Sequence, residues 1–133
     1  MKKELDEALV RDFPNLFQDR NAPMGQTCMC WGFECGDGWE PLIRRLCEKL
    51  EPLEVVAMQV KEKFGGLRFY TTGDVNDKVW EMTQEAETES YKSCEMCGKL
   101  GKLLTIKGHP LGWRKTLCPS HADQLGYREI EES

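Results

Sequence analysis

The chain contains 133 residues, of which 40% are hydrophobic and 31% are charged, and its formal net charge is −5. This composition excludes a disordered chain and suits one globular domain, or a small body with a metal-stabilised appendage. No apolar run approaches the ~20 residues of a membrane-spanning helix, and residues 1–10 lack the apolar core of a signal peptide. We therefore expect a cytoplasmic protein without membrane contact, whose seven cysteines are reduced thiols or metal ligands rather than disulfides.

Charge is unevenly distributed along the chain. Residues 1–93 contain 12 Lys and Arg against 18 Asp and Glu, whereas residues 94–133 contain 6 against 5. A mildly basic C-terminal segment thus follows an acidic body. This balance argues against binding of a nucleic-acid backbone by the whole protein, although it is compatible with a local contact.

The first half of the chain has two segments with helical periodicity. Residues 3–12 place apolar side chains on one face, and Pro14 predicts the end of this helix. Residues 39–50 have apolar side chains at the spacing of an amphipathic helix. We expect Asp37 to cap this second helix, with Glu40 as its partner in a capping box.

A hairpin and a long helix are predicted next. Residues 55–60 and 67–72 have the composition of strands, and the turn between them contains two glycines. Asp74 is expected to cap a helix that continues to about Ser93. The apolar residues on the inner face of this helix are Val75, Val79, Met82 and Ala86.

The strongest chemical pattern lies near the C-terminus. Two pairs, Cys94 with Cys97 and Cys118 with His121, each have two residues between the paired side chains. This spacing is typical of zinc knuckles, and three cysteines with one histidine are a common structural zinc set. Four protein ligands complete a tetrahedron and leave no position for water or substrate. The pattern therefore predicts one structural Zn²⁺ ion.

Short elements are predicted around these ligands in the order of a treble clef. Residues 102–107 and 113–117 are expected to form two strands, and residues 118–125 a helix that begins at the second ligand pair. Residues 127–133 are mostly polar and are predicted to form a frayed tail. A finger of this length has too few large apolar side chains to form an independent core. Metal binding would therefore supply its folding free energy.

The remaining cysteines, Cys28, Cys30, Cys35 and Cys47, have spacings that match no common zinc framework. This favours buried thiols that act as small apolar side chains, with a second metal site as the alternative. A catalytic thiol would need an activating group, and His109 is the only histidine besides the predicted ligand.

Two regions are candidate partner-binding surfaces. The stretch from residue 28 to residue 39, rich in aromatic residues and glycine, is either a recognition loop or core beneath the second helix. The basic residues near the tips of the two hairpins either contact a partner or are solvated. The candidates in the aromatic stretch are Trp31, Phe33 and Trp39. The candidates near the hairpin tips are Lys61, Lys63, Phe64, Arg68, Lys107, His109, Trp113 and Arg114.

Three motifs carry a resemblance to known sequences. They are MCWGFECGDGW at residues 29–39, QVKEKFGGLRFY at residues 59–70, and the two spaced ligand pairs. Through them, residues 13–122 resemble a group of small zinc-finger-containing proteins of bacteriophage and bacterial genomes. The resemblance supplies no catalytic residue and no substrate. It implies a phage or prophage origin, which favours a protein that binds a host factor, including inhibitors of host defence systems.

Together these patterns predict an α+β fold with a small antiparallel sheet, packed helices and a C-terminal treble-clef-like zinc finger. Residues 1–93 are expected to form the body, residues 94–126 a finger packed on it, and residues 127–133 the tail. The first functional hypothesis is a non-enzymatic protein that binds a host protein. One alternative is a nucleic-acid-binding accessory protein that uses the finger and the hairpin tip. The other is a His-based metal-dependent nuclease, for which only His109 is free.

Overall fold

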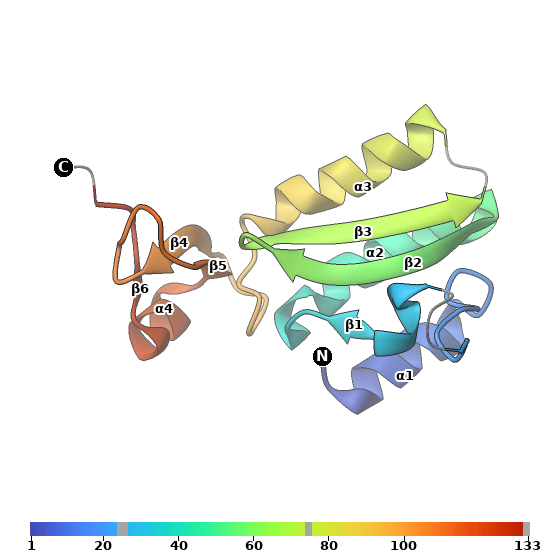
Figure 1. Cartoon of the computed structure of the whole chain (residues 1–133), viewed down its shortest axis with the longest axis horizontal. Helices are drawn as coiled ribbons and strands as arrows, with labels where there is room; N and C mark the ends of the chain where they lie inside the picture. The colour runs from blue at the N-terminus through green and yellow to red at the C-terminus, as the bar shows by residue number, and fades with distance from the viewer. Residues whose placement is uncertain (24–26, 74–75, 132–133) are drawn as a thin grey trace.

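The computed structural model describes residues 1–23, 27–73 and 76–131, which contain four α-helices and two three-stranded sheets. The elements of the body are α1 (Lys3–Asp12), β1 (Phe33–Glu34), α2 (Glu40–Leu50), β2 (Val55–Lys63), β3 (Gly66–Gly73) and α3 (Asp77–Ser90). The elements of the finger are β4 (Lys102–Ile106), β5 (Arg114–Leu117), α4 (Pro119–Leu125) and β6 (Tyr127–Arg128). Figure 1 shows the finger at one end of the long axis, next to the tip of the β2–β3 hairpin. The fold class is α+β, which confirms the prediction.

The body sheet is built around the long hairpin of β2 and β3. The two strands pair antiparallel with Lys63 opposite Gly66, so Phe64 and Gly65 alone form the turn. Both turn residues have positive φ, 54° for Phe64 and 84° for Gly65, which matches the twist of a two-residue hairpin. The short β1 adds parallel to β2, so the body sheet is mixed rather than purely antiparallel.

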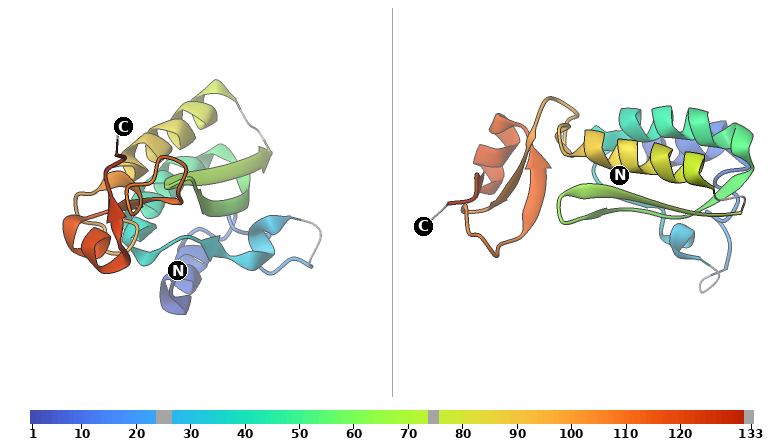
Figure 2. Two further views of the ribbon diagram at one scale, coloured as in Figure 1. Left: turned by 60° about the vertical axis from the view of Figure 1, so that its left-hand side comes forward. Right: turned by 90° about the horizontal axis from the view of Figure 1, so that it is seen from above.

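Helices α2 and α3 cover one face of this sheet, as the right-hand view of Figure 2 shows, and their apolar sides contribute to the core. Trp39, just before α2, is fully buried, and its indole Nε1 donates to the Ser93 carbonyl over 2.9 Å. Phe33 is buried with its ring edge-on to Phe17. The structure therefore corrects the recognition-loop hypothesis at two positions: Phe33 and Trp39 are core residues, and of the three candidates only Trp31 is exposed.

The predicted capping box at α2 is absent. The Asp37 carboxylate accepts a hydrogen bond from the Lys2 amide over 2.7 Å, and no side chain caps the helix. Glu40 pairs with Arg44 one turn further along, at 2.8 Å, instead of reaching back to the helix start. The reason is a 3-10 turn over Asp37–Trp39 that leads directly into the helix. The residue before the helix, Trp39, therefore lacks the extended backbone that a capping box needs.

Helix α3 begins slightly later than predicted. Its N-cap is Asn76, whose side chain accepts a hydrogen bond from the Val79 amide over 3.1 Å. The predicted inner face is confirmed at Val79 and Ala86, which are buried. The expected cap Asp74 and the expected inner-face residue Val75 lie outside the described residues.

The finger sheet has the order β5-β4-β6. Residues 127–131, predicted as part of a tail, instead complete this sheet: β6 pairs antiparallel with β4, and the Glu131 amide donates to the Gly108 carbonyl. The strand satisfies backbone groups along the second edge of β4, which a frayed tail would leave to water. None of the helices in the described ranges combines the length and the apolarity that a membrane crossing requires.

Candidate metal centre and the groove beside it

Four side chains of the finger converge on one point. Cys94 and Cys97 come from the turn before β4, Cys118 precedes α4, and His121 lies in the first turn of α4. Their ligand atoms all lie within 4.8 Å of one another. Within residues 1–23, 27–73 and 76–131, no other group of three or more His, Cys, Asp or Glu side chains is arranged to hold a metal ion.

The distances between these atoms fit a single tetrahedral ion. Cys97 Sγ lies 3.7 Å from Cys118 Sγ, and His121 Nδ1 lies 3.6 Å from Cys94 Sγ and 3.3 Å from Cys118 Sγ. Metal–sulfur bonds of about 2.3 Å and a metal–nitrogen bond of about 2.0 Å give tetrahedral edges of about 3.8 and 3.5 Å. The four side chains can therefore hold one metal ion with little rearrangement, with Nδ1 as the histidine ligand atom.

The start of α4 prepares Cys118 for this role. A hydrogen bond from the His121 backbone N–H is the main reason that the pKa of the Cys118 thiol is lowered to about 6, because it stabilises the thiolate. The thiolate is the form that binds a metal ion. Since four protein ligands complete the coordination sphere, the site has the closed form of a structural centre.

The first knuckle also joins the finger to the body. Glu95, between Cys94 and Cys97, accepts the Gly38 amide at its carbonyl over 2.7 Å and the Gly36 amide at its carboxylate over 2.9 Å. A Cβ on Gly38 would lie 2.2 Å from the Cys94 carbonyl oxygen and 2.6 Å from the Cys97 nitrogen. Only glycine permits so close an approach of two backbones. The Gly-Asp-Gly segment thus holds the metal knuckle in place.

The turn of the β2–β3 hairpin makes a second contact with the finger. Thr116 Oγ1, on β5, donates to the Gly65 carbonyl over 2.7 Å in a buried position. A Cβ on Gly65 would lie 2.4 Å from Leu103 Cδ1 on β4. The two long glycine-containing motifs of the sequence therefore share one function, which is to meet the finger from two sides.

Sequence reasoning missed Glu95 as a docking residue. Its side chain is buried, burial raises the pKa of its carboxyl, and Lys115 Nζ lies 3.7 Å away. The signal in the sequence was an acid inside the metal knuckle of an otherwise basic segment. Its partner Gly36 is 59 residues away, so no local pattern could pair the two.

The other cysteines do not gather into a second metal group in the described part of the chain. Cys35 and Cys47 are buried in the core, and burial raises the pKa of Cys35 to about 12 and that of Cys47 in the same direction. Cys28 is exposed, and Cys30 Sγ donates to the Thr27 carbonyl over 3.4 Å. The two buried thiols therefore act as small apolar side chains.

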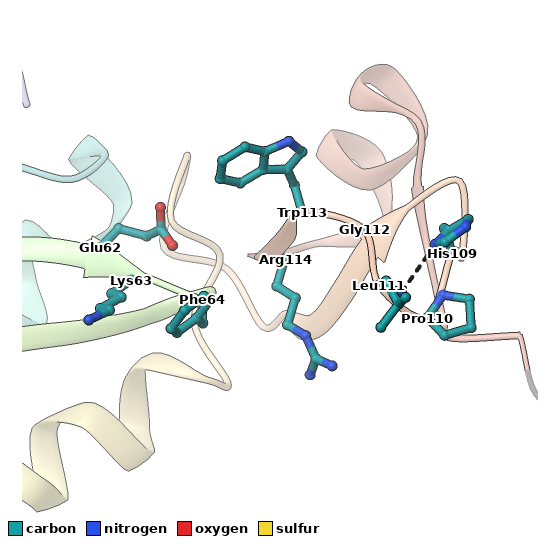
Figure 3. Close-up of a pocket in the computed structure, with 9 residues that line it drawn as sticks. All are labelled: Glu62, Lys63, Phe64, His109, Pro110, Leu111, Gly112, Trp113 and Arg114. Carbon is teal, nitrogen blue, oxygen red and sulfur yellow. Dashed lines mark hydrogen bonds between the residues drawn. The ribbon is translucent and has the colours of Figure 1, made fainter.

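A groove lies between the tip of the β2–β3 hairpin and the loop that joins β4 to β5 (Figure 3). This junction groove has a volume of about 820 Å³ and is lined by Glu62, Lys63, Phe64, His109, Pro110, Leu111, Gly112, Trp113 and Arg114. Phe64, Leu111 and Trp113 expose 65%, 91% and 81% of their surfaces. Exposed apolar patches of this kind are typical of interaction sites.

Hydrogen bonds within the β4–β5 loop hold the finger side of the junction groove in shape. His109 Nδ1 accepts the Leu111 amide over 3.1 Å, the dashed line in Figure 3, and the His109 carbonyl accepts the Gly112 amide over 3.0 Å. At the base of the loop, the Ile106 amide donates to the Trp113 carbonyl over 2.9 Å. Leu111 and Trp113 are thus presented from an ordered frame, which lowers the entropy cost of binding.

Five of the predicted partner-binding residues line the junction groove, namely Lys63, Phe64, His109, Trp113 and Arg114. Lys107 is exposed in the same loop, and Lys61 is half-buried on β2. Arg68 does not line the groove, and its guanidinium forms an ion pair with Glu87 of α3. Trp31 is exposed on the body and does not line the groove.

Comparison with known proteins places the chain in no family: no protein-family model, curated protein or solved structure matches it. The metal centre and the junction groove are therefore the observations from which a function can be inferred.

Proposed function

We propose that this chain is a non-enzymatic zinc-binding protein that acts by binding a host protein at the junction groove. The observation that carries the proposal is the exposure of Phe64, Leu111 and Trp113 on both walls of one groove. Exposed aromatic side chains on an ordered frame are the usual anchors of protein interfaces. Burying the exposed parts of Phe64, Leu111 and Trp113 supplies several kcal/mol, at about 1.5–3 kcal/mol for each complete burial.

Zinc is the metal proposed for the four-ligand centre. Three thiolates and one imidazole in a tetrahedron are a ligand set that zinc prefers, and closed sites of this type stabilise folds rather than catalyse reactions. In this chain the metal would anchor the knuckle whose backbone contacts Gly36 and Gly38. Zinc would thereby hold the finger wall of the junction groove opposite the hairpin wall.

The composition of the junction groove favours a protein partner over a nucleic acid. Its lining includes the cations Lys63 and Arg114 and the anion Glu62, together with the aliphatic side chains Pro110 and Leu111. Nucleic-acid grooves need a continuous row of cations along the backbone of the strand. A nuclease is disfavoured because His121 belongs to the metal centre, which leaves His109 without a second histidine for a catalytic metal site.

A phage or prophage origin is proposed on the resemblance of residues 13–122 to small phage and bacterial zinc-finger proteins. In that setting the host protein would be a bacterial one, and inhibition of a defence system is the consequence of binding that we propose. Glycine contacts explain why the two long motifs of this resemblance accompany the finger, since Gly38 and Gly65 meet it directly.

Differential capture from bacterial lysate tests the proposal. Trp113→Ala should lose a protein that the wild-type chain retains, because it removes a large apolar side chain from the finger wall of the junction groove. Leu100→Ala is the matched control, since Leu100 is also exposed on the finger but does not line the groove. A captured protein that survives Trp113→Ala, or no specific capture by the wild-type chain, would refute the proposal. Salt-sensitive binding of labelled single-stranded DNA that is lost in Trp113→Ala would instead support the nucleic-acid alternative.

A further inference from the structure

Strand β3 forms one edge of the body sheet, and its backbone groups face outward at alternate residues. The hairpin closes with Lys63 opposite Gly66 in a hydrogen-bonded pair, so the backbone of the next residue, Leu67, turns away from β2. The Leu67 amide indeed donates to Ser90 Oγ of α3 over 2.9 Å. Helix α3 therefore satisfies the first outward-facing amide of this edge.

By the same alternation, the backbone N–H and C=O groups of Phe69 and Thr71 point toward the free edge. Thr71 lies opposite Ala57 of β2, and the Ala57 amide donates away from β3, to the Leu16 carbonyl, over 2.8 Å. The pair is therefore not hydrogen-bonded across the hairpin, which leaves the Thr71 backbone directed outward. In the described part of the chain, no hydrogen bond satisfies the outward N–H and C=O of either residue.

Helix α3 lies close to β3 at Ser90 and diverges from the strand toward its own N-terminus, which opens a groove along this free edge. Figure 1 shows the helix near the strand at its C-terminal end and further from it at its beginning. This edge groove has a volume of about 220 Å³. Its lining residues are Arg68, Phe69, Tyr70 and Thr71 of β3 and Val79, Trp80, Thr83, Gln84 and Glu87 of α3. The edge groove thus combines unpaired backbone N–H and C=O groups of β3 with space for the side chains of a bound segment.

The charge beside the edge groove indicates its occupant. Arg68 is neutralised by Glu87, whereas Glu81 and Glu85 have no cation within ion-pair distance among the described residues. Trp80 is 61% exposed and also lines a second hollow, together with Glu81, Gln84, Glu85, Thr88, Glu89 and Lys92. An exposed indole beside acidic groups attracts a lysine or arginine side chain through cation–π and charge interactions.

We infer that the free edge of β3 binds an extended, basic segment of a partner protein as an added strand. The backbone of the segment pairs with Phe69 and Thr71, and its basic side chains lie at Trp80, Glu81 and Glu85. This mode of recognition uses backbone hydrogen bonds for affinity and flanking side chains for selectivity. The edge groove is separate from the junction groove, and the inference does not rest on the function proposed for that surface.

Amide hydrogen exchange in the full chain tests whether the edge is open. The Phe69 and Thr71 amides should exchange at least tenfold faster than the Arg68 and Tyr70 amides, which face β2. Equal protection of all four amides would overturn the inference, because it would mean that the edge is already covered.

Peptide binding tests the occupant, with a blocked eight-residue peptide of alternating valine and lysine as the probe. We expect saturable binding that protects Phe69 and Thr71 and weakens at least fivefold in Trp80→Ala and in the double variant Glu81→Gln, Glu85→Gln. Trp31→Ala is the matched control, because Trp31 is also 61% exposed but lies away from this edge.

The same peptide with N-methyl groups on alternate residues should not bind, since it cannot pair with a strand, and a valine–glutamate peptide should bind at least fivefold more weakly. No binding of the valine–lysine peptide at millimolar concentration, or equal binding by the N-methylated form, overturns the inference. A concentration-dependent dimer that protects the same amides also overturns it, because the occupant would then be a second copy of the chain.

Discussion

Replacing Gly38 by alanine tests whether the first metal knuckle holds the finger to the body. The new Cβ would lie 2.2 Å from the Cys94 carbonyl oxygen, 2.5 Å from the Gly98 nitrogen and 2.6 Å from the Cys97 nitrogen. All three neighbours are backbone atoms of the knuckle, so no flexible side chain can move aside. The backbone of Gly38 does not have positive φ, so the cost of the substitution arises from the contact and not from backbone conformation.

The magnitude follows from the contacts that must separate. Ordinary carbon–oxygen contact requires the two segments to move apart by roughly 1 Å or more, which breaks the 2.7 Å hydrogen bond from the Gly38 amide to the Glu95 carbonyl. The neighbouring bonds from Gly36 to Glu95 and from Trp39 to Ser93 are strained by the same movement. At about 1 kcal/mol for each net hydrogen bond, the expected loss of stability is about 2–3 kcal/mol.

Urea unfolding of the full metal-loaded chain measures this loss, with Gly126→Ala as the control. Gly126 ends α4 with φ 75°, and a Cβ there would meet no atom closer than 4.0 Å. Its replacement therefore incurs only the cost of a left-handed conformation, about 1 kcal/mol. Metal content should stay at one ion per chain in both variants. A Gly38→Ala protein that is no less stable than Gly126→Ala would refute the docking role of the knuckle.

Three further predictions concern the metal, the hairpin tip and the thiols. Chelation at neutral pH should melt residues 94–131 and abolish partner binding; unchanged spectra and melting in the metal-free protein would contradict this. Phe64→Asn should raise the free energy of unfolding by about 0.5–1 kcal/mol, because asparagine tolerates positive φ better, while weakening partner capture; loss of stability in urea would count against it. Iodoacetamide at pH 8 should label Cys28 in the folded protein and leave Cys35 and Cys47 unmodified, as peptide mass spectrometry would show, because both buried thiols have raised pKa values.

Local patterns predicted the regular elements well. The helix at residues 3–12 coincides with α1, and the predicted finger strands and helix correspond to β4, β5 and α4. The four candidate metal ligands were identified by spacing alone, since a two-residue gap can bring paired side chains to one ion whatever the rest of the fold does. Hydrophobic periodicity and knuckle spacing are short-range properties, which is why they can be seen without a structure.

Contacts between distant residues were not predictable in this way. The prediction that Asp37 caps α2 was wrong, because its carboxylate accepts a hydrogen bond from the Lys2 amide. The predicted tail contains β6, because residues 127–128 pair with the second edge of β4. Arg68 pairs with Glu87 of α3 and does not line the junction groove. Each outcome depends on which elements lie side by side, and the sequence contains no local signal for that.

The candidate metal site shows most clearly which features follow from the sequence and which depend on tertiary structure. Its four candidate ligands are determined by the sequence, because side chains at knuckle spacing can converge on one ion. Its place in the molecule is decided by tertiary structure, because Gly38 and Gly65 reach the finger across long chain separations. A Cβ on Gly38 would collide with the backbone of the knuckle, and a Cβ on Gly65 would collide with the Leu103 side chain of β4. The same contacts set Phe64 opposite Trp113 and create the junction groove, a surface that belongs to neither segment alone.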